Sequence, residues 1–345
     1  PHRMKHTPIQ AHQLEKGSIR ITQYQSDNLI VPLIKDVLES PLAGTTGILT
    51  KTNEDAVFIA CLLQEQGMPV RLVQTNSGNF YLGDLDEIRY FNRALDLSQD
   101  THLIDDERWE TAKRCLKREF GHAQSWEICR NIILNFEQVY SRKYHSDWTN
   151  YLFESKLEDF YPVQGEAIVV STIHKAKGKE FDNVFLLLTN IESLSDEKKR
   201  EVYVAITRAK QNLSIHTNGH YLSNIANGLA EYRINSNTYP APQSLCYTLT
   251  HRDLWLDFFI DSHCQAAINT LKSGMSLRLT EKGCTDFSNN EILRFSKKFK
   301  DILNELIQKD YKLEKASVNF VVYWEKQEDK KEAKIVLPKV VFKKV

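Results

Sequence analysis

Two polar segments of the sequence carry residue types that bind phosphate and sugar groups. The first runs from Val169 to Phe185, where an apolar stretch leads through a polar loop into a second apolar stretch. Thr172 and His174 lie at the start of this loop and could donate hydrogen bonds to phosphate oxygens. Gly178 would let a ligand approach the backbone closely, because glycine has no side chain. Ligands of open parallel sheets lie outside the carboxyl ends of the strands, so we expect the loop at that edge.

A purely structural interpretation of this first segment is about equally consistent with the pattern. The loop could be an ordinary strand connection with solvated lysines. A single histidine such as His174 is more often structural than functional. The segment alone therefore leaves both interpretations open.

The second segment runs from Asp196 to Lys210 and has the pattern of a helix that is polar at its start and more apolar later. Arg208 lies at the end of this helix, before the next apolar stretch. A guanidinium placed there can reach a phosphate across a cleft and stabilise charge that develops during phosphoryl transfer. The alternative is a surface helix whose arginine pairs with a carboxylate, and the segment taken alone favours that alternative.

Several common catalytic motifs are absent from the chain. It contains no GxxxxGKS or GxxxxGKT phosphate loop, no GxGxxG after a strand pattern and no HExxH. Its six cysteines include no CxxC pair, so their spacing indicates no zinc site and we predict no metal ligands. Isolated cysteines are typical of a reducing compartment.

The elements that must position the two segments alternate between strand and helix patterns. This order predicts a mostly parallel sheet flanked by helices, and Asn53 is expected to cap the second helix. The expected strands are 18–24, 46–50, 69–73, 166–171, 183–189 and 211–216, and the expected helices are 28–39, 53–66 and 196–209. Between about 84 and 160 strand signals vanish, so we predict a helical insertion that interrupts the sheet domain.

The C-terminal part has a different character. Residues 219–250 are polar and weakly patterned, which is typical of a linker. The capping-box spacing of Ser288 and Glu291 predicts a helix after them. Two strands at 318–324 and 334–342 follow, so we expect a small α+β module. Residues 271–345 hold 17 Lys and Arg against 11 Asp and Glu, a surplus that could contact nucleic acid or simply be solvated.

The length of 345 residues predicts two or three domains. The chain holds 45 Lys and Arg and 45 Asp and Glu, and this neutral balance excludes a wholesale polycation without excluding a local basic groove. No apolar run approaches the length of a membrane span, and no signal core follows the N-terminus. We therefore expect a cytoplasmic protein with no membrane contact.

Taken together, the two segments resemble motifs V and VI of the UvrD/Rep/PcrA group of superfamily 1 DNA helicases. The matching residues follow the family patterns TxHxxKGxEF and YVxxTRA. They are Thr172, His174, Lys177, Gly178, Glu180 and Phe181, then Tyr203, Val204, Thr207, Arg208 and Ala209. More weakly, residues 46–53, including Thr52 and Asn53, resemble motif IV of that family. The resemblance covers about residues 16–220.

The resemblance implies a RecA-like domain that is the second of two, with ATP bound in the cleft between them. It implies that Arg208 is the arginine finger on the γ-phosphate and that Glu180 accepts a hydrogen bond from the ribose. Gly178 falls in the same nucleotide-binding loop. Thr172, His174, Thr52 and Asn53 match positions near the path of single-stranded or partly duplex DNA. ATP and Mg would be held mainly by a first RecA-like domain upstream.

The sequence also departs from the family. The usual leucine of motif V is replaced by Lys179, which is expected to alter packing under the loop. The helical insertion is much shorter than the family's helical subdomain. The family's Asn-Tyr-Arg motif, which joins the two domains, is absent and would precede Pro1, so we expect the chain to be the C-terminal part of a longer protein.

The expected architecture is therefore α/β, a RecA-like parallel sheet with a helical insertion, followed by a small α+β C-terminal module. We assign 1–98 and 161–220 to the second RecA-like domain, 99–160 to the insertion, 221–250 to a linker and 251–345 to the accessory module. The leading function is the C-terminal motor half of an ATP-dependent DNA helicase, inactive alone. The alternative is a non-hydrolysing nucleic-acid-binding or scaffold module. A helicase–nuclease is disfavoured because 251–345 has no convincing carboxylate cluster with a lysine.

Overall fold

The computed structural model describes residues 17–73, 81–96, 102–161, 167–189, 195–224, 230–261 and 263–345. The chain forms two compact units. The first comprises Pro1–Ala56 with Glu166–Ala241, and the second comprises Val57–Gly165 with Pro242–Val345.

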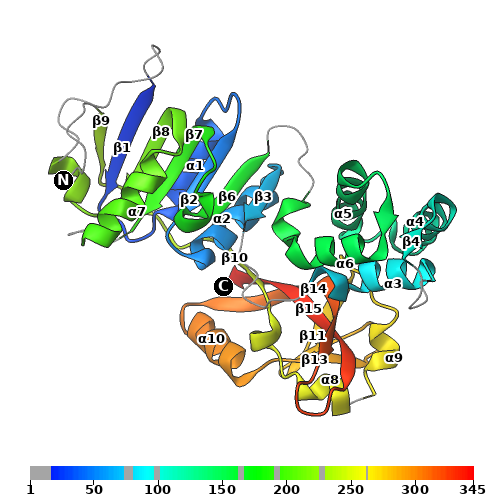
Figure 1. Ribbon diagram of the computed structural model, residues 1–345. Helices are drawn as coiled ribbons and strands as arrows, with labels where there is room; N and C mark the ends of the chain where they lie inside the picture. The colour runs from blue at the N-terminus through cyan, green and yellow to red at the C-terminus, as the bar shows by residue number, and fades with distance from the viewer. Residues whose placement is uncertain are drawn as a thin grey trace. The chain divides into compact units, whose positions relative to one another are not determined.

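A seven-stranded sheet organises the first part of the chain (Figure 1). Its strand order is β3-β6-β2-β7-β8-β1-β9, and each pair whose register is described is parallel. The central strands β2 and β7 are almost wholly buried, as expected for apolar runs covered on both faces. The strands are β1 (Ser18–Tyr24), β2 (Thr46–Thr50), β3 (Val70–Val73), β6 (Ile168–Thr172), β7 (Phe181–Leu188), β8 (Ala209–Thr217) and β9 (Glu231–Asn235).

Three helices connect these strands. They are α1 (Ile30–Glu39), α2 (Asn53–Glu65) and α7 (Asp196–Ile206). α1 buries Leu33, Ile34 and Val37, and α7 contributes Val202 and Ala205 to the core of the sheet. The predicted α/β class with a parallel, RecA-like sheet is confirmed.

A buried polar network ties β1 and β8 to α1. The Asp36 carboxylate accepts hydrogen bonds from Arg20 at 2.6 and 2.7 Å and from Ser214 Oγ at 2.8 Å, and its Oδ2 lies 3.0 Å from His216 Nε2. Tyr24 Oη lies 2.8 Å from His216 Nδ1. His216 is fully buried, and burial lowers its pKa below 6.5. Burial alone would raise the pKa of Asp36, but hydrogen bonds from His216 and Ser214 and the Arg20 charge lower it to about 2.

This network predicts a stability that falls in two steps on acidification. The unfolded chain protonates His216 near pH 6.5 while the folded chain keeps it neutral, so the free energy of unfolding should decrease below that pH. Asp36 stays ionised in the folded chain down to about pH 2, so its contribution is present above 3.8 and is lost between 3.8 and about 2.

Urea unfolding of the first unit between pH 8 and 5 measures the first step. A His216→Asn variant should lose most of the pH dependence in this range. The matched control is His251→Asn, because His251 lies in the second unit and burial lowers its pKa as well. An unchanged pH dependence in His216→Asn would contradict the assignment.

A helical block and an antiparallel sheet make up the second unit. The block contains α3 (Asp86–Ala94), α4 (Asp106–Phe120), α5 (Trp126–Val139) and α6 (His145–Glu154), with the short pair β4 (Leu103–Ile104) and β5 (Lys143–Tyr144). An aromatic cluster fills its centre, where the Trp109 ring lies 5.0 Å from Phe91, 5.4 Å from Phe136 and 5.3 Å from Trp148.

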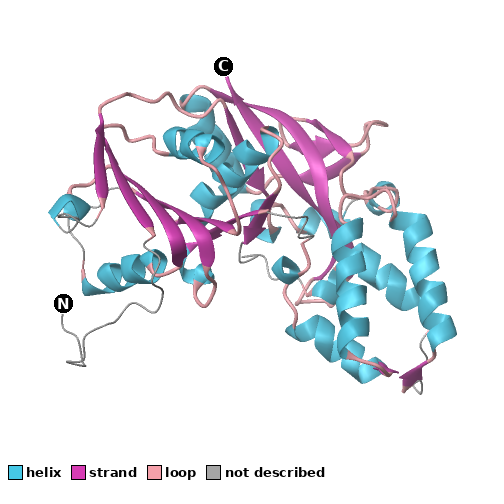
Figure 2. Cartoon of the chain, turned by 90° about the horizontal axis from the view of Figure 1, so that it is seen from above, coloured by secondary structure: helices cyan, strands magenta, loops and turns pink. Residues whose placement is uncertain are grey.

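The six-stranded sheet has the order β10-β15-β14-β11-β12-β13, and its strand pairs are antiparallel. Its long strands are the magenta arrows nearest the C-terminus in Figure 2. The long hairpin of β14 and β15 is its main feature. The elements are β10 (Ser244–Thr248), α8 (Asp257–Asp261), α9 (Gln265–Ile268), β11 (Ser276–Leu279), β12 (Gly283–Thr285), β13 (Glu291–Arg294), α10 (Lys297–Gln308), β14 (Tyr311–Glu325) and β15 (Glu332–Lys344). The predicted C-terminal α+β module is present.

Polar contacts join the helical block to this C-terminal sheet. Lys334 Nζ lies 2.7 Å from Asp86 Oδ1. The Ser125 hydroxyl donates to buried Glu87 and accepts from Ser273 Oγ at 2.7 Å. Burial raises the pKa of Glu87, which favours a neutral carboxyl in this site. The block therefore shares its compact unit with the C-terminal sheet. The expected boundary at residue 98 lies outside the described residues, and the expected division into domains stays a prediction.

Two local predictions differ from the structure. Residues 221–250, expected as a linker, contain β9 and β10. Each strand has only five residues, too few for its pattern to stand out from the polar sequence around it. The helix expected after Ser288 begins only after Ser296, whose hydroxyl accepts from the Phe299 amide at 3.2 Å. Asn289 has a φ of 65°, so the backbone turns there and continues as β13.

Candidate functional site

The carboxyl ends of β2 and β6 bring three of the predicted DNA-contacting residues to one edge of the sheet. The two strands are parallel neighbours, and Thr50 lies opposite Thr172 in the register. Thr52 and Asn53 follow β2 directly. Lys175, which follows β6, donates from Nζ to Asn53 Oδ1 at 3.4 Å. The structure therefore brings the segments that resemble motifs IV and V together.

The individual side chains at this edge differ in accessibility. Thr172 is only 6% exposed, whereas Thr52 and Asn53 are exposed. Thr52, not Asn53 as expected, caps the start of α2, because its hydroxyl accepts from the Asp55 amide at 3.1 Å. The same hydroxyl donates to the Asp55 carboxylate at 2.7 Å. Asn53 is therefore more available to a ligand than either threonine.

His174 connects the loop to α7. It lies in the short turn Ile173–Ala176, with a side chain that is 78% exposed. Its Nε2 lies 3.3 Å from Oε1 of Glu201, whose side chain is only 15% exposed. The histidine is therefore held by α7 while most of its surface faces solvent.

Gly178, Glu180 and Arg208 lie at the amino ends of the strands, whereas Thr172 lies at the carboxyl end of β6. The chain leaves the carboxyl end of β6 and reaches the amino end of β7 at Phe181, whose amide donates to the Arg208 carbonyl at 2.8 Å. The expectation that the whole loop lies at the carboxyl ends is therefore wrong, because the crossover returns along the sheet within eight residues. Gly178 has a φ of 83° and open space around it, so its conformation requires glycine.

The Arg208 side chain is held entirely by neutral oxygens. Its Nε donates to the Val204 carbonyl at 2.9 Å, and its two terminal nitrogens donate to the Lys179 carbonyl and to Thr207 Oγ1, each at 3.1 Å. Within the described part of the chain no carboxylate pairs with it. The alternative of a surface ion pair is thus not found, and the positive charge is available to an anion.

The bond from Arg208 to Lys179 also bears on the departure from motif V. The Lys179 side chain is exposed, and its contact with Arg208 is made by the backbone carbonyl. This contact does not depend on the side chain at position 179, and the expected change in packing under the loop stays a prediction. Glu180 is exposed and makes no hydrogen bond to another described residue.

A cavity of about 460 Å³ lies between the loop and α7 in the first unit. Three cations line it, Lys177, Lys198 and Arg200, together with two carboxylates. One of these carboxylates, Glu201, faces His174. The amino-terminal turn of α7 also borders it, and helix N-termini attract anions. The complete lining is Ile173, His174, Lys177, Ser195, Glu197, Lys198, Arg200, Glu201 and Val204.

The sequence analysis did not identify Lys198, Arg200 and Glu201 as site residues. Their signal was the mixed charge of the first turns of α7, which resembles any solvated helix surface. Only the fold shows that this surface faces the loop that carries His174 and Lys177.

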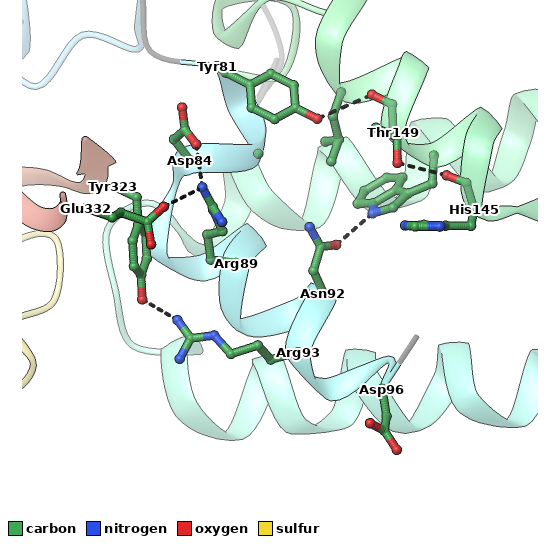
Figure 3. Close-up of a pocket in the computed structure, with 13 residues that line it drawn as sticks. Tyr81, Asp84, Arg89, Asn92, Arg93, Asp96, His145, Thr149, Tyr323 and Glu332 are labelled. Carbon is green, nitrogen blue, oxygen red and sulfur yellow. Dashed lines mark hydrogen bonds and ion pairs between the residues drawn. The ribbon is translucent and has the colours of Figure 1, made fainter. Parts of the chain in front are cut away.

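A larger cavity of about 880 Å³ lies in the second unit, between one face of α3 and one face of α6 (Figure 3). Its arginines are already engaged. Arg89 lies 3.0 Å from Asp84 and 2.9 Å from Glu332, and Arg93 donates to the Tyr323 hydroxyl. None of the predicted site residues lines this cavity. All the predicted site residues lie in the first unit.

Among the described residues, no group of three His, Cys, Asp or Glu is placed to hold a metal ion. The same residues contain no helix that is both long and apolar enough to cross a membrane.

Part of the chain matches a known family of protein domains. Residues 132–220 match the family model of the UvrD-like helicase C-terminal domain. The matched stretch includes the loop of His174 and Gly178 and the helix that ends before Arg208. No curated protein matches the chain. The chain therefore carries a UvrD-like C-terminal domain of the superfamily 1 helicase type, and the resemblance stated from the motifs is confirmed. Such a domain implies interaction with nucleic acid in general.

Proposed function

We propose that this chain is the second motor domain, with attached modules, of an ATP-dependent DNA helicase or translocase. The observation that supports the proposal most directly is the set of hydrogen-bond partners of Arg208. Its guanidinium is positioned by three neutral oxygens and has no carboxylate partner among the described residues. An arginine finger must reach the transferred phosphate, and an arginine that is not engaged by a carboxylate is available for that contact.

In this proposal, the residues at the amino ends of β7 and β8 would face the nucleotide. Arg208 would stabilise the charge that develops on the γ-phosphate, and Glu180, which is exposed, would accept a hydrogen bond from the ribose. Gly178 leaves open space beside the loop. Bound Mg²⁺ would neutralise charge on the phosphates, and its ligands would come from a first RecA-like domain upstream. This chain alone would then lack ATPase activity.

The same loop would couple nucleotide binding to DNA binding. Thr52, Asn53, Thr172 and His174 would border the path of single-stranded DNA, and the cations of the neighbouring cavity would contact its phosphates without reading sequence. His174 contacts Glu201 on α7, and Arg208 follows the end of that helix. A shift of α7 on hydrolysis would therefore act on both sites.

Binding of a labelled single-stranded oligonucleotide tests the DNA path. We expect a Lys177→Ala/Arg200→Ala variant to bind more weakly and to show a smaller salt dependence. The slope of log K against log salt should fall by roughly 0.7 for each lost phosphate contact. Fluorescence anisotropy between low and moderate salt gives both quantities.

The matched control removes two cations from the C-terminal helix α10, in Lys297→Ala/Lys300→Ala. This control should bind as the unchanged chain does. If both variants lose affinity equally, the DNA contacts are not specific to the cavity beside α7. If DNA binding persists but a complete two-domain protein shows no ATPase activity, the chain is a non-hydrolysing nucleic-acid module instead.

A further inference from the structure

Two of the six free cysteines lie together in the second unit. Cys61 on α2 and Cys246 on β10 belong to one small buried cluster with Val57, and Leu72 and Val341 pack against it. Cys246 lies opposite Val341 in the register of β10 and β15. The neighbouring pair Phe58 and Tyr247, with ring centroids 5.2 Å apart, confirms that α2 lies against β10. Two thiols separated by more than 180 residues of sequence thus meet in the fold.

The two thiols are unequal. The pKa of Cys246 is lowered, first by its hydrogen bond with Cys61 and further by the charge of Lys339. The same bond raises the pKa of Cys61, and burial adds to this effect. The thiolate is the reactive form of cysteine, so Cys246 is the better nucleophile of the two.

The cluster lies close to the surface. Both cysteines are buried, but Lys339 is half-buried, and its Nζ donates to the exposed Gln64 at 3.3 Å. Gln64 lies one helical turn after Cys61. Cys61 itself is 7% exposed and Cys246 is 3% exposed, so the thiol pair lies at the margin of the buried region and not deep within it.

The other cysteines provide a comparison. Cys129 and Cys284 are buried, and burial raises the pKa of each, to about 12 for Cys284. Neither shares the buried cluster of Cys61 and Cys246. Cys115 is half-buried.

We propose that Cys61 and Cys246 form an oxidisable dithiol that hydrogen peroxide converts to a disulfide between α2 and β10. The Cys246 thiolate attacks one oxygen of the peroxide and breaks the O–O bond, which gives a sulfenic acid and, after protonation, water. The Cys61 sulfur then attacks the sulfenic sulfur, its proton leaves with the hydroxyl group, and a second water forms. Two thiols lose two electrons and two protons, and one peroxide takes them up.

The disulfide would restrain α2, the helix that begins at the predicted DNA-contacting residues Thr52 and Asn53. α2 begins at Asn53, directly after Thr52, and the disulfide would fix its later turns to the C-terminal sheet. Closing so long a loop restricts the unfolded chain, so the oxidised form should be more resistant to unfolding. The inference rests on the thiol cluster and stands independently of the proposed helicase function.

Thiol counting and peptide mapping of the whole chain test this proposal. After brief treatment with hydrogen peroxide, the chain is unfolded and alkylated with N-ethylmaleimide. The number of reactive thiols should fall from six to four, and digestion should yield one peptide pair joined through Cys61 and Cys246. A reductant should restore six thiols.

Single substitutions give the controls. Cys61→Ser and Cys246→Ser should each abolish the linked peptide, whereas Cys284→Ser, which removes another buried thiol, should retain it. If a serine variant fails to fold, Cys61→Ala, with no polar atom to bury, replaces it. A count that stays at six, or a disulfide that involves Cys115 instead, would overturn the proposal.

Discussion

Replacing Arg208 by alanine should lower DNA-stimulated ATP hydrolysis by about 10³- to 10⁵-fold, the usual contribution of an arginine finger. The measurement requires a protein in which this chain follows a first RecA-like domain with a phosphate loop. The physical reason is that the guanidinium has no carboxylate to neutralise it among the described residues and is already positioned by the Lys179 carbonyl. Little reorganisation is then needed when charge develops on the γ-phosphate.

Two further variants separate charge from structure at this position. Arg208→Lys keeps the charge but cannot bond to Val204, Thr207 and Lys179 at once, so it should recover little activity. Lys210→Ala removes a neighbouring exposed cation and should leave hydrolysis nearly unchanged. The folded state of Arg208→Ala should be retained, since its side chain is only half-buried and its backbone bond to Phe181 remains. Normal turnover in Arg208→Ala would refute the assignment.

The sheet was predictable because the sequences of its central strands are clearly those of buried strands. β2 and β7 are short apolar runs between turn signals, and such runs are buried on both faces of a parallel sheet. β9 was not predicted, because its alternation of Tyr232 and Ile234 with polar residues extends over only five residues. The association of the helical block with the C-terminal sheet could not be predicted for another reason. It depends on contacts such as Asp86 with Lys334, which join positions far apart in the sequence.

The candidate site was predictable only where motif spacing reflects geometry. Thr172, Gly178 and Arg208 were found because they fit the spacing of two known helicase motifs. Their distribution over two edges of the sheet was missed, since the sequence does not show how far the loop returns along β6. Arg200 was missed because the sequence does not show which face of α7 borders the loop of His174. The fold places Arg200 and His174 around the same cavity.

Replacing Trp109 by alanine should have the largest effect on stability, about 3–5 kcal/mol. Its side chain is fully buried and contacts the rings of Phe91, Phe136 and Trp148. Its indole nitrogen donates to Glu137 Oε1 at 2.6 Å, a bond that alanine cannot replace. The expected loss therefore combines a large cavity with a weakened anchor for a partly buried carboxylate.

Urea unfolding with hydrogen exchange measured by mass spectrometry checks this result. Protection should fall in α4, α5 and α6 and in the C-terminal sheet, because these belong to one compact unit, while β2 and β7 of the first unit keep theirs. Trp109→Phe retains most of the ring contacts and should lose less than half as much. Trp255→Ala is the exposed control, since that side chain is 47% exposed, and should change the free energy of unfolding by less than about 1 kcal/mol. Equal destabilisation by Trp109→Ala and Trp255→Ala would show that the aromatic cluster does not form the core of this unit.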